Sequence, residues 1–207
     1  MKSVLNSPYL FWLLLALPSI PMTMGIVSGG EVESLLHPTG EFAARFMIIA
    51  MIISPFRLMF PKNRFWLWMV RRRRYLGVAA FSYAFAHTVL YIVDIGSLAN
   101  ALGEALLLGI WTGWLAMFVF IPLALTSNDW SVKRLGHNWK RLQQTVYIAA
   151  IATLLHWIFV HNNVGPALVH FLPLATLELY RIWKTYGQQP ATRAAIEKPL
   201  PVENWKD

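Results

Sequence analysis

The sequence RRRRYLGVAAFSYAFAHTVLYIVD, from Arg71 to Asp94, decides the fold class of this chain. It begins with four arginines, continues with a mostly apolar run and ends with an aspartate. An apolar run of about twenty residues predicts a helix that spans a membrane. One histidine, His87, lies in the middle of the run. An ionisable side chain is costly inside lipid, so His87 is a candidate functional residue whose partner has to be found.

The composition of the whole chain also places it with membrane proteins. Of its 207 residues, 57% are hydrophobic and 14% are charged, whereas soluble domains are about 45–50% apolar and about 25% charged. The formal net charge of +8 does not indicate nucleic acid, because the basic residues lie between apolar runs and act as topology signals. The chain has no cysteine, which excludes disulfides, Cys-ligated iron–sulfur clusters and haem attached through C-x-x-C-H.

Six apolar runs predict an all-α membrane protein that is a six-transmembrane-helix bundle. The first run contains Pro18 and Pro21, and we expect a retained helix kinked at these prolines rather than a cleaved signal sequence. Residues 1–186 are expected to form one domain, followed by a mobile cytoplasmic tail, residues 187–207. The expected spans are about residues 8–29, 41–60, 76–96, 106–126, 143–160 and 167–186.

The positions of lysine and arginine predict how the chain lies in the membrane. The segments after the second and fourth spans, together with the C-terminus, hold nearly all of these residues, and the other three connections hold none. The positive-inside rule then places both termini in the cytoplasm. The basic segment 57–74 contains Trp66 and Trp68 and is expected to lie on the membrane surface, at the level of the headgroups.

A second histidine, His156, is expected at the depth of His87. On a helix, His87 lies about three turns beyond Leu76, and His156 lies about three and a half turns beyond Gln143. At about 1.5 Å per residue, both are about 16–20 Å from the cytoplasmic side, just past the middle of the membrane. Two neutral imidazoles on facing helices can take both axial positions of one haem iron. The alternative is that each histidine only hydrogen-bonds a carbonyl group in a helix interface.

Arg45 and His170 are weaker candidates for the same site. Arg45 lies about one turn inside the second span, where it could form a salt bridge to a haem propionate; the alternative is snorkelling and a pair with Glu41. His170 lies about one turn into the sixth span, where it could bind a propionate or act as an alternative ligand, although packing is the simpler interpretation. His37 and His161 are expected at the outer interface, in contact with solvent.

Several short motifs carry a resemblance to a known family. They are H-P-T-G from His37, I-S-P-F-R ending at Arg57, R-R-Y-L-G from Arg73, A-H-T around His87, L-T-S at residues 125–127, and R-L-G-H-N-W-K-R-L-Q-Q-T-V-Y from Arg134. In this order and spacing they resemble the MsrQ (YedZ) family, within the ferric-reductase-like transmembrane superfamily. The resemblance covers most of residues 30 to 165.

The resemblance implies a haem b protein of six helices, multi-pass, in the bacterial inner membrane. It implies electron transfer from a cytoplasmic flavin reductase, or from quinol, to a periplasmic molybdopterin-dependent reductase of the MsrP type that repairs methionine sulfoxide. His87 and His156 match the family's haem-binding histidines. The resemblance also implies FMN as a cofactor, and the sequence locates no site for it.

The chain departs from the family pattern at a second haem site. The family usually has a further histidine at the position where this chain has Gln143, near the cytoplasmic end of the span that carries His156. Relatives with two haems have another inner ligand at the positions of Arg73 or Arg74. Because glutamine and arginine are poor haem ligands, we expect one haem per chain, ligated by His87 and His156 near the outer side.

Two other functions stay open on the sequence alone. The same haem could reduce a metal ion or a quinone, or the chain could be a haem-free membrane scaffold or transporter in which the histidines only form hydrogen bonds. In the leading interpretation, the chain is a redox subunit of an oxidoreductase system rather than a stand-alone enzyme, and its partners are proteins and lipid, not nucleic acid.

Overall fold

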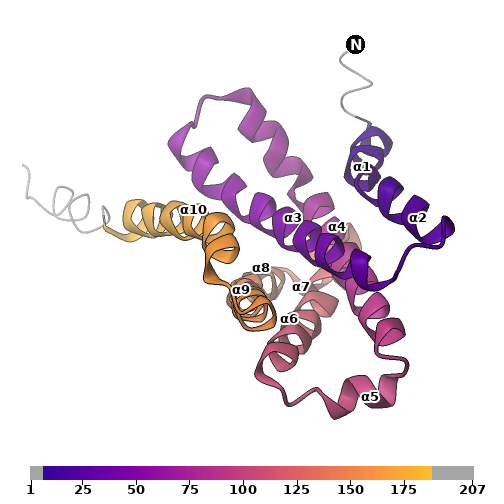
Figure 1. Cartoon of the computed structure of the whole chain (residues 1–207). Helices are drawn as coiled ribbons and strands as arrows, with labels where there is room; N and C mark the ends of the chain where they lie inside the picture. Colours follow the sequence, from indigo (N-terminus) through magenta and orange to yellow (C-terminus); the bar gives the residue numbers. More distant parts are fainter. Residues whose placement is uncertain (1–6, 188–207) are drawn as a thin grey trace, which may run out of the picture.

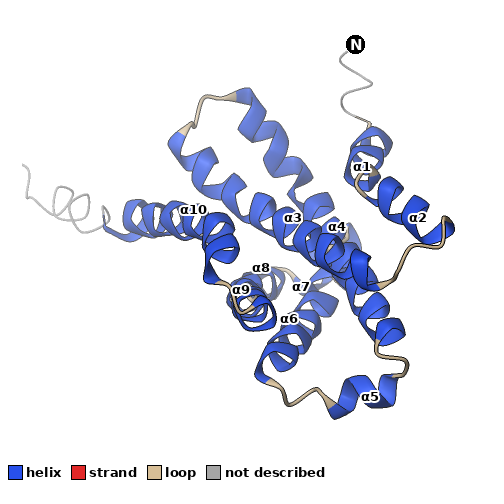
Figure 2. Cartoon of the chain, viewed as in Figure 1, coloured by secondary structure: helices blue, strands red, loops and turns tan. Residues whose placement is uncertain are grey.

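The computed structural model describes residues 7–187, and each regular element within them is a helix (Figure 2). The tail expected at residues 187–207 lies outside the described residues, apart from Gly187. In chain order the elements are α1 (Pro8–Ala16), α2 (Ser19–Val27), α3 (Glu33–Met59), α4 (Arg64–Asp94), α5 (Leu98–Gly103), α6 (Leu108–Leu125), α7 (Asp129–Leu135), α8 (His137–Gln144), α9 (Val146–His161), α10 (Val164–Ile182) and a π-helical turn, Trp183–Gly187.

The described residues contain four helices that are long and apolar enough to cross a membrane: α3, α4, α6, and α9 taken together with α8. Helices α1 and α2 form a fifth candidate if they are one bent span, since their axes differ by 50°. The bend lies next to Pro18, so the predicted kink there is confirmed. Helix α10 does not reach the same hydropathy, because it carries Pro173, Glu178 and Arg181. The chain is therefore a multi-pass membrane protein, with four or five candidate spans among its described residues.

Helix α4 is longer than the sequence pattern predicts. It begins at Arg64, where the side chain of Asn63 caps it by accepting a hydrogen bond of 2.8 Å from the backbone N–H of Phe65. The expected surface segment, residues 57–74, is therefore not a separate element: residues 57–59 end α3, and residues 64–74 are the first turns of the long helix α4. No glycine or proline lies between Asn63 and Leu76, so nothing in the sequence ends the helix there.

The helices are arranged as two hairpins with other helices around them (Figure 1). Helices α3 and α4 pack along each other as one hairpin, and α6 packs along α9 as the other. Helix α10 packs on α3, and α1 contacts α4. The centre of the core consists of α3 side chains, including Met47, Met51 and Ile53, which are almost completely buried. Alanines on facing helices, such as Ala80 of α4 and Ala149 of α9, have no exposed surface.

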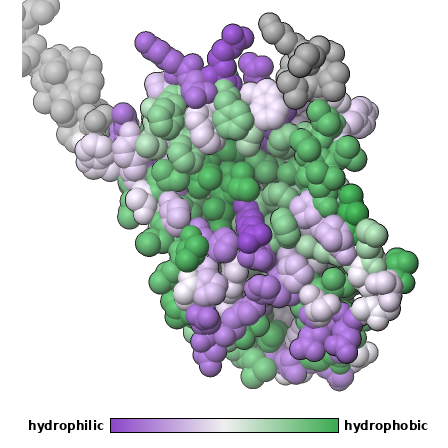
Figure 3. All heavy atoms as spheres, turned by 45° about the horizontal axis from the view of Figure 1, so that its top comes forward, coloured by the Kyte–Doolittle hydropathy of each residue, from purple (hydrophilic) through white to green (hydrophobic). Residues whose placement is uncertain are grey.

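Large apolar side chains on the outside of the bundle fit a lipid environment. Leu13, Phe85, Phe118 and Val169 are each more than half exposed. Figure 3 shows one face on which hydrophobic side chains cover a broad area, with hydrophilic side chains at its top, in its lower part and in a group near its middle. In a helical bundle the backbone hydrogen bonds are made within each helix, so such a surface can face lipid without unpaired backbone groups.

The buried small residues of α9 give a test of the packing. Ala149 is fully buried, whereas its neighbour Ile148 is half exposed. We expect Ala149→Leu to lower the free energy of unfolding by about 1–3 kcal/mol, because the larger side chain has no space in the bundle. Ile148→Leu is expected to change it by less than about 0.5 kcal/mol. Thermal unfolding in detergent measures both, and equal stability of the two variants would contradict this packing.

Candidate functional site

The structure brings His87 of α4 and His156 of α9 together. Their ring centroids lie 6.0 Å apart, and the ring planes are at 82° to each other. Metal–imidazole bonds are about 2 Å long, so two imidazoles on opposite sides of one metal ion have ring centres roughly 6 Å apart. The observed separation therefore suits two imidazoles that bind one ion between them.

Each imidazole is held by a hydrogen bond from its Nδ1 atom to a backbone carbonyl group. His87 Nδ1 lies 2.9 Å from the oxygen of Leu36 in α3, and His156 Nδ1 lies 2.7 Å from the oxygen of Gly109 in α6. A carbonyl oxygen only accepts, so Nδ1 carries the proton in both rings and Nε2 has the free lone pair. Metal-binding histidines usually donate their second N–H in this way, which fixes the tautomer and the ring orientation.

A glycine lies against each imidazole, at the same position relative to the accepting carbonyl group. A β-carbon at Gly40 would be 3.1 Å from His87 Nδ1, and one at Gly113 would be 2.8 Å from His156 Nδ1. Gly40 follows Leu36 by four positions, and Gly113 follows Gly109 by four. A helical side chain covers the turn that precedes its own Cα. The glycines therefore leave both carbonyl oxygens open to the imidazoles.

Both histidines line a cavity of about 440 Å³, which we call the histidine cavity. Its volume is in the range typical of ligand sites, about 300–1,000 Å³. The buried hydroxyl oxygen of Thr153, which also lines it, has no hydrogen-bond partner among the described residues. Small residues give it width between the helices: Gly40, Ala43, Ala44, Ala84, Gly113 and Ala116.

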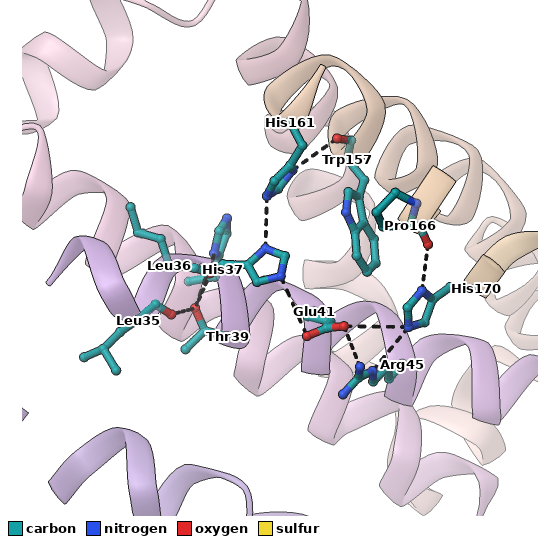
Figure 4. Close-up of polar contacts among 11 residues, drawn as sticks. Leu35, Leu36, His37, Thr39, Glu41, Arg45, Trp157, His161, Pro166 and His170 are labelled. Atoms are coloured by element: carbon teal, nitrogen blue, oxygen red, sulfur yellow. Dashed lines mark hydrogen bonds and ion pairs between the residues drawn. The ribbon is translucent and has the colours of Figure 1, made fainter. Parts of the chain in front are cut away.

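Three polar residues connect α3 to α9 at one end of the histidine cavity (Figure 4). His37 Nδ1 and His161 Nε2 are 3.0 Å apart, and His161 Nδ1 donates to the carbonyl oxygen of Trp157 at 3.2 Å. His161 Nε2 therefore accepts from His37, which leaves His37 Nε2 facing Glu41 Oε2 at 3.9 Å. The sequence predicted only solvent contact for these exposed histidines, because two residues so far apart in the chain carry no signal of pairing.

Arg45 and His170 lie beside this group and do not line the histidine cavity within the described part of the chain. Arg45 Nη2 and Glu41 Oε1 form an ion pair of 2.5 Å, and Arg45 Nε donates to His170 Nε2 at 3.4 Å. His170 Nδ1 in turn donates to the carbonyl oxygen of Pro166 at 2.8 Å. The structure thus pairs Arg45 with Glu41, which was one of the two alternatives, and brings His170 to the same carboxylate (Figure 4).

The positions considered for a second pair of ligands lie in a different cavity. Gln143, Arg73 and Arg74 line a space of about 680 Å³. Gln143 Nε2 donates to the carbonyl oxygen of Leu123 at 3.1 Å, and Arg73 donates to Ser54 Oγ at 3.0 Å. The structure therefore holds Gln143 and Arg73 through ordinary hydrogen bonds.

Two imidazoles alone do not complete the coordination of a transition metal, which binds four to six ligands. Within residues 7–187 there is no group of three or more His, Asp or Glu side chains placed to hold a metal ion. The histidine pair therefore suits a metal whose remaining ligands belong to a bound group, and the small residues around it leave space for a flat one.

Comparison with known proteins identifies the family. A family model described as "Ferric reductase like transmembrane component" matches residues 39–154, a range that contains His87 and ends just before His156. The protein-methionine-sulfoxide reductase heme-binding subunit MsrQ of Rhizobium meliloti (strain 1021) is 34% identical over 205 residues, which are 86% of this chain and 89% of that protein. The chain belongs to the MsrQ family of ferric-reductase-like transmembrane proteins.

Other MsrQ proteins match over most or about two thirds of the chain. The heme-binding subunit MsrQ of Brucella anthropi is 31% identical over 208 residues, which are 96% of this chain and 91% of that protein. The one from Agrobacterium fabrum is 34% identical over 136 residues, which are 64% of this chain and 61% of that protein. No solved structure matches this chain. The MsrQ match thus extends over nearly the whole chain, including the histidine cavity.

Proposed function

We propose that this chain holds one haem b between His87 and His156 and serves as the electron-transfer subunit of a methionine sulfoxide reductase. The observation that carries this proposal is the histidine pair, with ring centroids 6.0 Å apart and both Nδ1 atoms bound to carbonyl groups. The printed name of the relatives, heme-binding subunit of a protein-methionine-sulfoxide reductase, supports both the cofactor and the system.

The residues present fit a haem. A porphyrin provides four nitrogen ligands in a plane and leaves two axial positions, which two imidazoles can occupy. The glycines at 40 and 113 and the alanines around them make space for a flat group between α3, α4, α6 and α9. The unpaired hydroxyl of Thr153 lines the same space.

Bound haem would supply a one-electron carrier whose potential depends on its ligands and on burial. The chain's own residues determine both the ligands and the burial of the haem. The carbonyl groups of Leu36 and Gly109 hold both imidazoles as neutral Nδ1–H tautomers, so the two Nε2 atoms would be the ligands. Arg45 and His170 contact Glu41, which lines the histidine cavity, and Arg45 remains our candidate for a salt bridge to a haem propionate.

Loss of either histidine should remove the haem. We expect His87→Ala and His156→Ala each to abolish stoichiometric haem, because one axial nitrogen is lost, whereas Gln143→Ala keeps it. Absorption spectra of the purified protein, oxidised and dithionite-reduced, measure this together with a haem-to-protein ratio of one. Full haem in both histidine variants would refute the ligand assignment, and two haems per chain would refute the single site.

The glycine beside His156 gives a second test of the same site. In Gly113→Ala, the added β-carbon would lie 2.8 Å from His156 Nδ1, so the imidazole must leave its hydrogen bond to Gly109. We expect bound haem to fall at least about tenfold, which corresponds to roughly 1.4 kcal/mol. Gly103→Ala is the control, because its β-carbon would meet no atom within 4 Å. Equal haem content in both variants would show that the glycine does not position the ligand.

We also propose that the chain crosses a bacterial inner membrane six times with both termini in the cytoplasm. In this arrangement α1 with α2 forms the first span and α10 the last, and α7 and α8 lie on the cytoplasmic side. The charges support it: the α7–α8 region holds Lys133, Arg134, Lys140 and Arg141, whereas the segment from Ile95 to Leu107 contains no lysine or arginine. Lysine and arginine are retained on the cytoplasmic side.

Cysteine labelling tests this topology without a background signal, because the natural chain has no cysteine. We expect Ala105→Cys to react with a membrane-impermeant maleimide in spheroplasts. Asn138→Cys and Thr185→Cys should react only after the membrane is opened, because both lie on the cytoplasmic side. Labelling of Thr185→Cys in closed spheroplasts would contradict a cytoplasmic C-terminus and, with it, the sixth span.

The partners follow from the same assignment. We propose a periplasmic molybdopterin-dependent reductase of the MsrP type as the electron acceptor, and a cytoplasmic flavin reductase or the quinone pool as the donor, with FMN as a further cofactor. The relatives' name supports a methionine sulfoxide reductase as the partner. The histidine cavity is lined by Glu33, His37 and His161 at one end, the end that the proposed topology turns toward the periplasm.

A further inference from the structure

The two carbonyl groups that accept from the imidazoles each receive a further hydrogen bond, from a threonine three positions later in the same helix. Thr39 Oγ1 donates to the oxygen of Leu36 in α3 at 3.0 Å, and Thr112 Oγ1 donates to the oxygen of Gly109 in α6 at 2.8 Å. Both threonines are almost completely buried. In each helix the next residue is the glycine that leaves the carbonyl oxygen open. The dipeptide Thr-Gly therefore occupies the same place in both hairpins.

The need of a buried hydroxyl for an acceptor explains only part of this arrangement. A threonine inside a helix commonly donates to the carbonyl group four positions earlier, and Thr39 and Thr112 do so at 2.7 and 3.0 Å. Thr88 and Thr176 do the same, at 2.9 Å each, and the described residues give these two no second acceptor. The second contact of Thr39 and Thr112 is therefore a separate feature, and it reaches an oxygen that also holds an imidazole.

Three donors meet at each of these two carbonyl oxygens. A carbonyl oxygen has two lone pairs, and in an α-helix one of them accepts the backbone N–H of the residue four positions later. The imidazole N–H and the threonine O–H then share what remains. Because both donors draw on the electron density of the same oxygen, the hydroxyl weakens the hydrogen bond that the oxygen accepts from Nδ1–H of the histidine.

The strength of this hydrogen bond affects the opposite nitrogen of the imidazole ring. A strong acceptor on Nδ1–H raises the basicity of Nε2 as a metal ligand, and a more basic ligand stabilises oxidised iron relative to reduced iron. Hydrogen bonding around the ligands is one of the means by which a protein sets the potential of a haem. A hydroxyl that weakens the acceptor therefore lowers the basicity of Nε2 and raises the reduction potential.

We propose that Thr39 and Thr112 raise the reduction potential of the bound haem, each by competing with an imidazole for its carbonyl oxygen. This inference rests on the proposed function, since it requires a haem between His87 and His156. Within the described residues, neither threonine lines the histidine cavity. Each is therefore a positioning residue that acts through its histidine and not by contact with the haem.

The two threonines should not contribute equally. Thr112 lies closer to the shared oxygen than Thr39 does, at 2.8 Å compared with 3.0 Å. Thr39 Oγ1 also lies 3.3 Å from His87 Nδ1, so it is a second, weaker acceptor for that N–H group. Removal of the Thr39 hydroxyl takes away a competitor and an acceptor at once, and these losses have opposite effects on Nε2. We therefore expect the larger effect from Thr112.

The experiment is a potentiometric titration of the purified full-length protein in detergent, followed through the absorption bands of the haem. Thr112→Val keeps the shape of the side chain without the hydroxyl, Thr112→Ala removes the hydroxyl without branching, and Thr112→Ser retains it. Thr39→Val is the second test. Thr176→Val is the control, because Thr176 is exposed and its hydroxyl donates to Leu172. Electron paramagnetic resonance of the oxidised haem reports the angle between the imidazole planes in the same samples.

We expect a lower midpoint potential in Thr112→Val than in the natural protein. At a fixed solution potential, the ratio of reduced to oxidised haem should fall at least about threefold, which is roughly 30 mV because a tenfold change in a one-electron couple is about 59 mV. Thr112→Ala should shift the potential in the same direction, and Thr39→Val should shift it by less. Thr112→Ser and Thr176→Val should keep the natural potential. Haem content and the angle between the imidazole planes should stay unchanged in each variant.

The inference is overturned if Thr112→Val and Thr112→Ala keep or raise the potential, or if Thr112→Ser lowers it as much as they do. Loss of haem from both hydroxyl-free variants would also overturn it, because a hydroxyl that only competes for the carbonyl oxygen leaves the ligand in place. A natural protein without haem would refute the proposed function together with this inference. A natural protein with haem, and variants whose potentials do not shift, would refute this inference alone.

Discussion

The central constraint on this bundle is that a histidine inside an apolar interior must keep its Nδ1–H hydrogen-bonded. Within residues 7–187, the nearest acceptors for His87 and His156 are the carbonyl oxygens of Leu36 and Gly109, which belong to neighbouring helices. Thr39 Oγ1 also lies 3.3 Å from His87 Nδ1. A helical carbonyl oxygen already accepts a bond from the residue four positions later, and its second lone pair is normally shielded by that residue's side chain. Glycine at 40 and at 113 removes the shield. Helix spacing, ring orientation and tautomer all follow from these two contacts.

The same arrangement occurs twice, once in each hairpin. In the first hairpin, α4 carries the histidine, and α3 carries the accepting carbonyl group and the glycine. In the second hairpin, α9 carries the histidine, and α6 carries the accepting carbonyl group and the glycine. Each hairpin therefore positions one of the two imidazoles by itself. The remaining helices complete the molecule around this pair, with α10 against α3 and α1 against α4. The second cavity, which Gln143, Arg73 and Arg74 line, lies between the same two hairpins, and Phe120 lines both cavities.

The sequence predicted the features that depend on side-chain type and failed on those that depend on backbone atoms. Apolar length located the long helices, and helical rise placed His87 and His156 at one depth. The hydrogen-bond acceptors of these two histidines were not predictable, because every residue has the same backbone carbonyl group. A hint in the sequence is that a glycine, Gly40 or Gly113, follows each accepting residue by four positions. The first turns of α4 were missed because a run of arginines was interpreted as a surface segment, although Asn63 is a good helix cap.

His87 and His156 lie far apart along the chain, and this has a consequence for how the protein is made and inserted into the membrane. His156 lies two long helices later in the chain than His87, so during synthesis the first hairpin enters the membrane with a prepared imidazole and no counterpart. The complete site exists only when the second hairpin has also been made. A group held by both imidazoles, as proposed above, would then cross-link two halves of the chain that are made at different times. Its binding would stabilise the contact between the two hairpins, because a ligand stabilises the state that binds it.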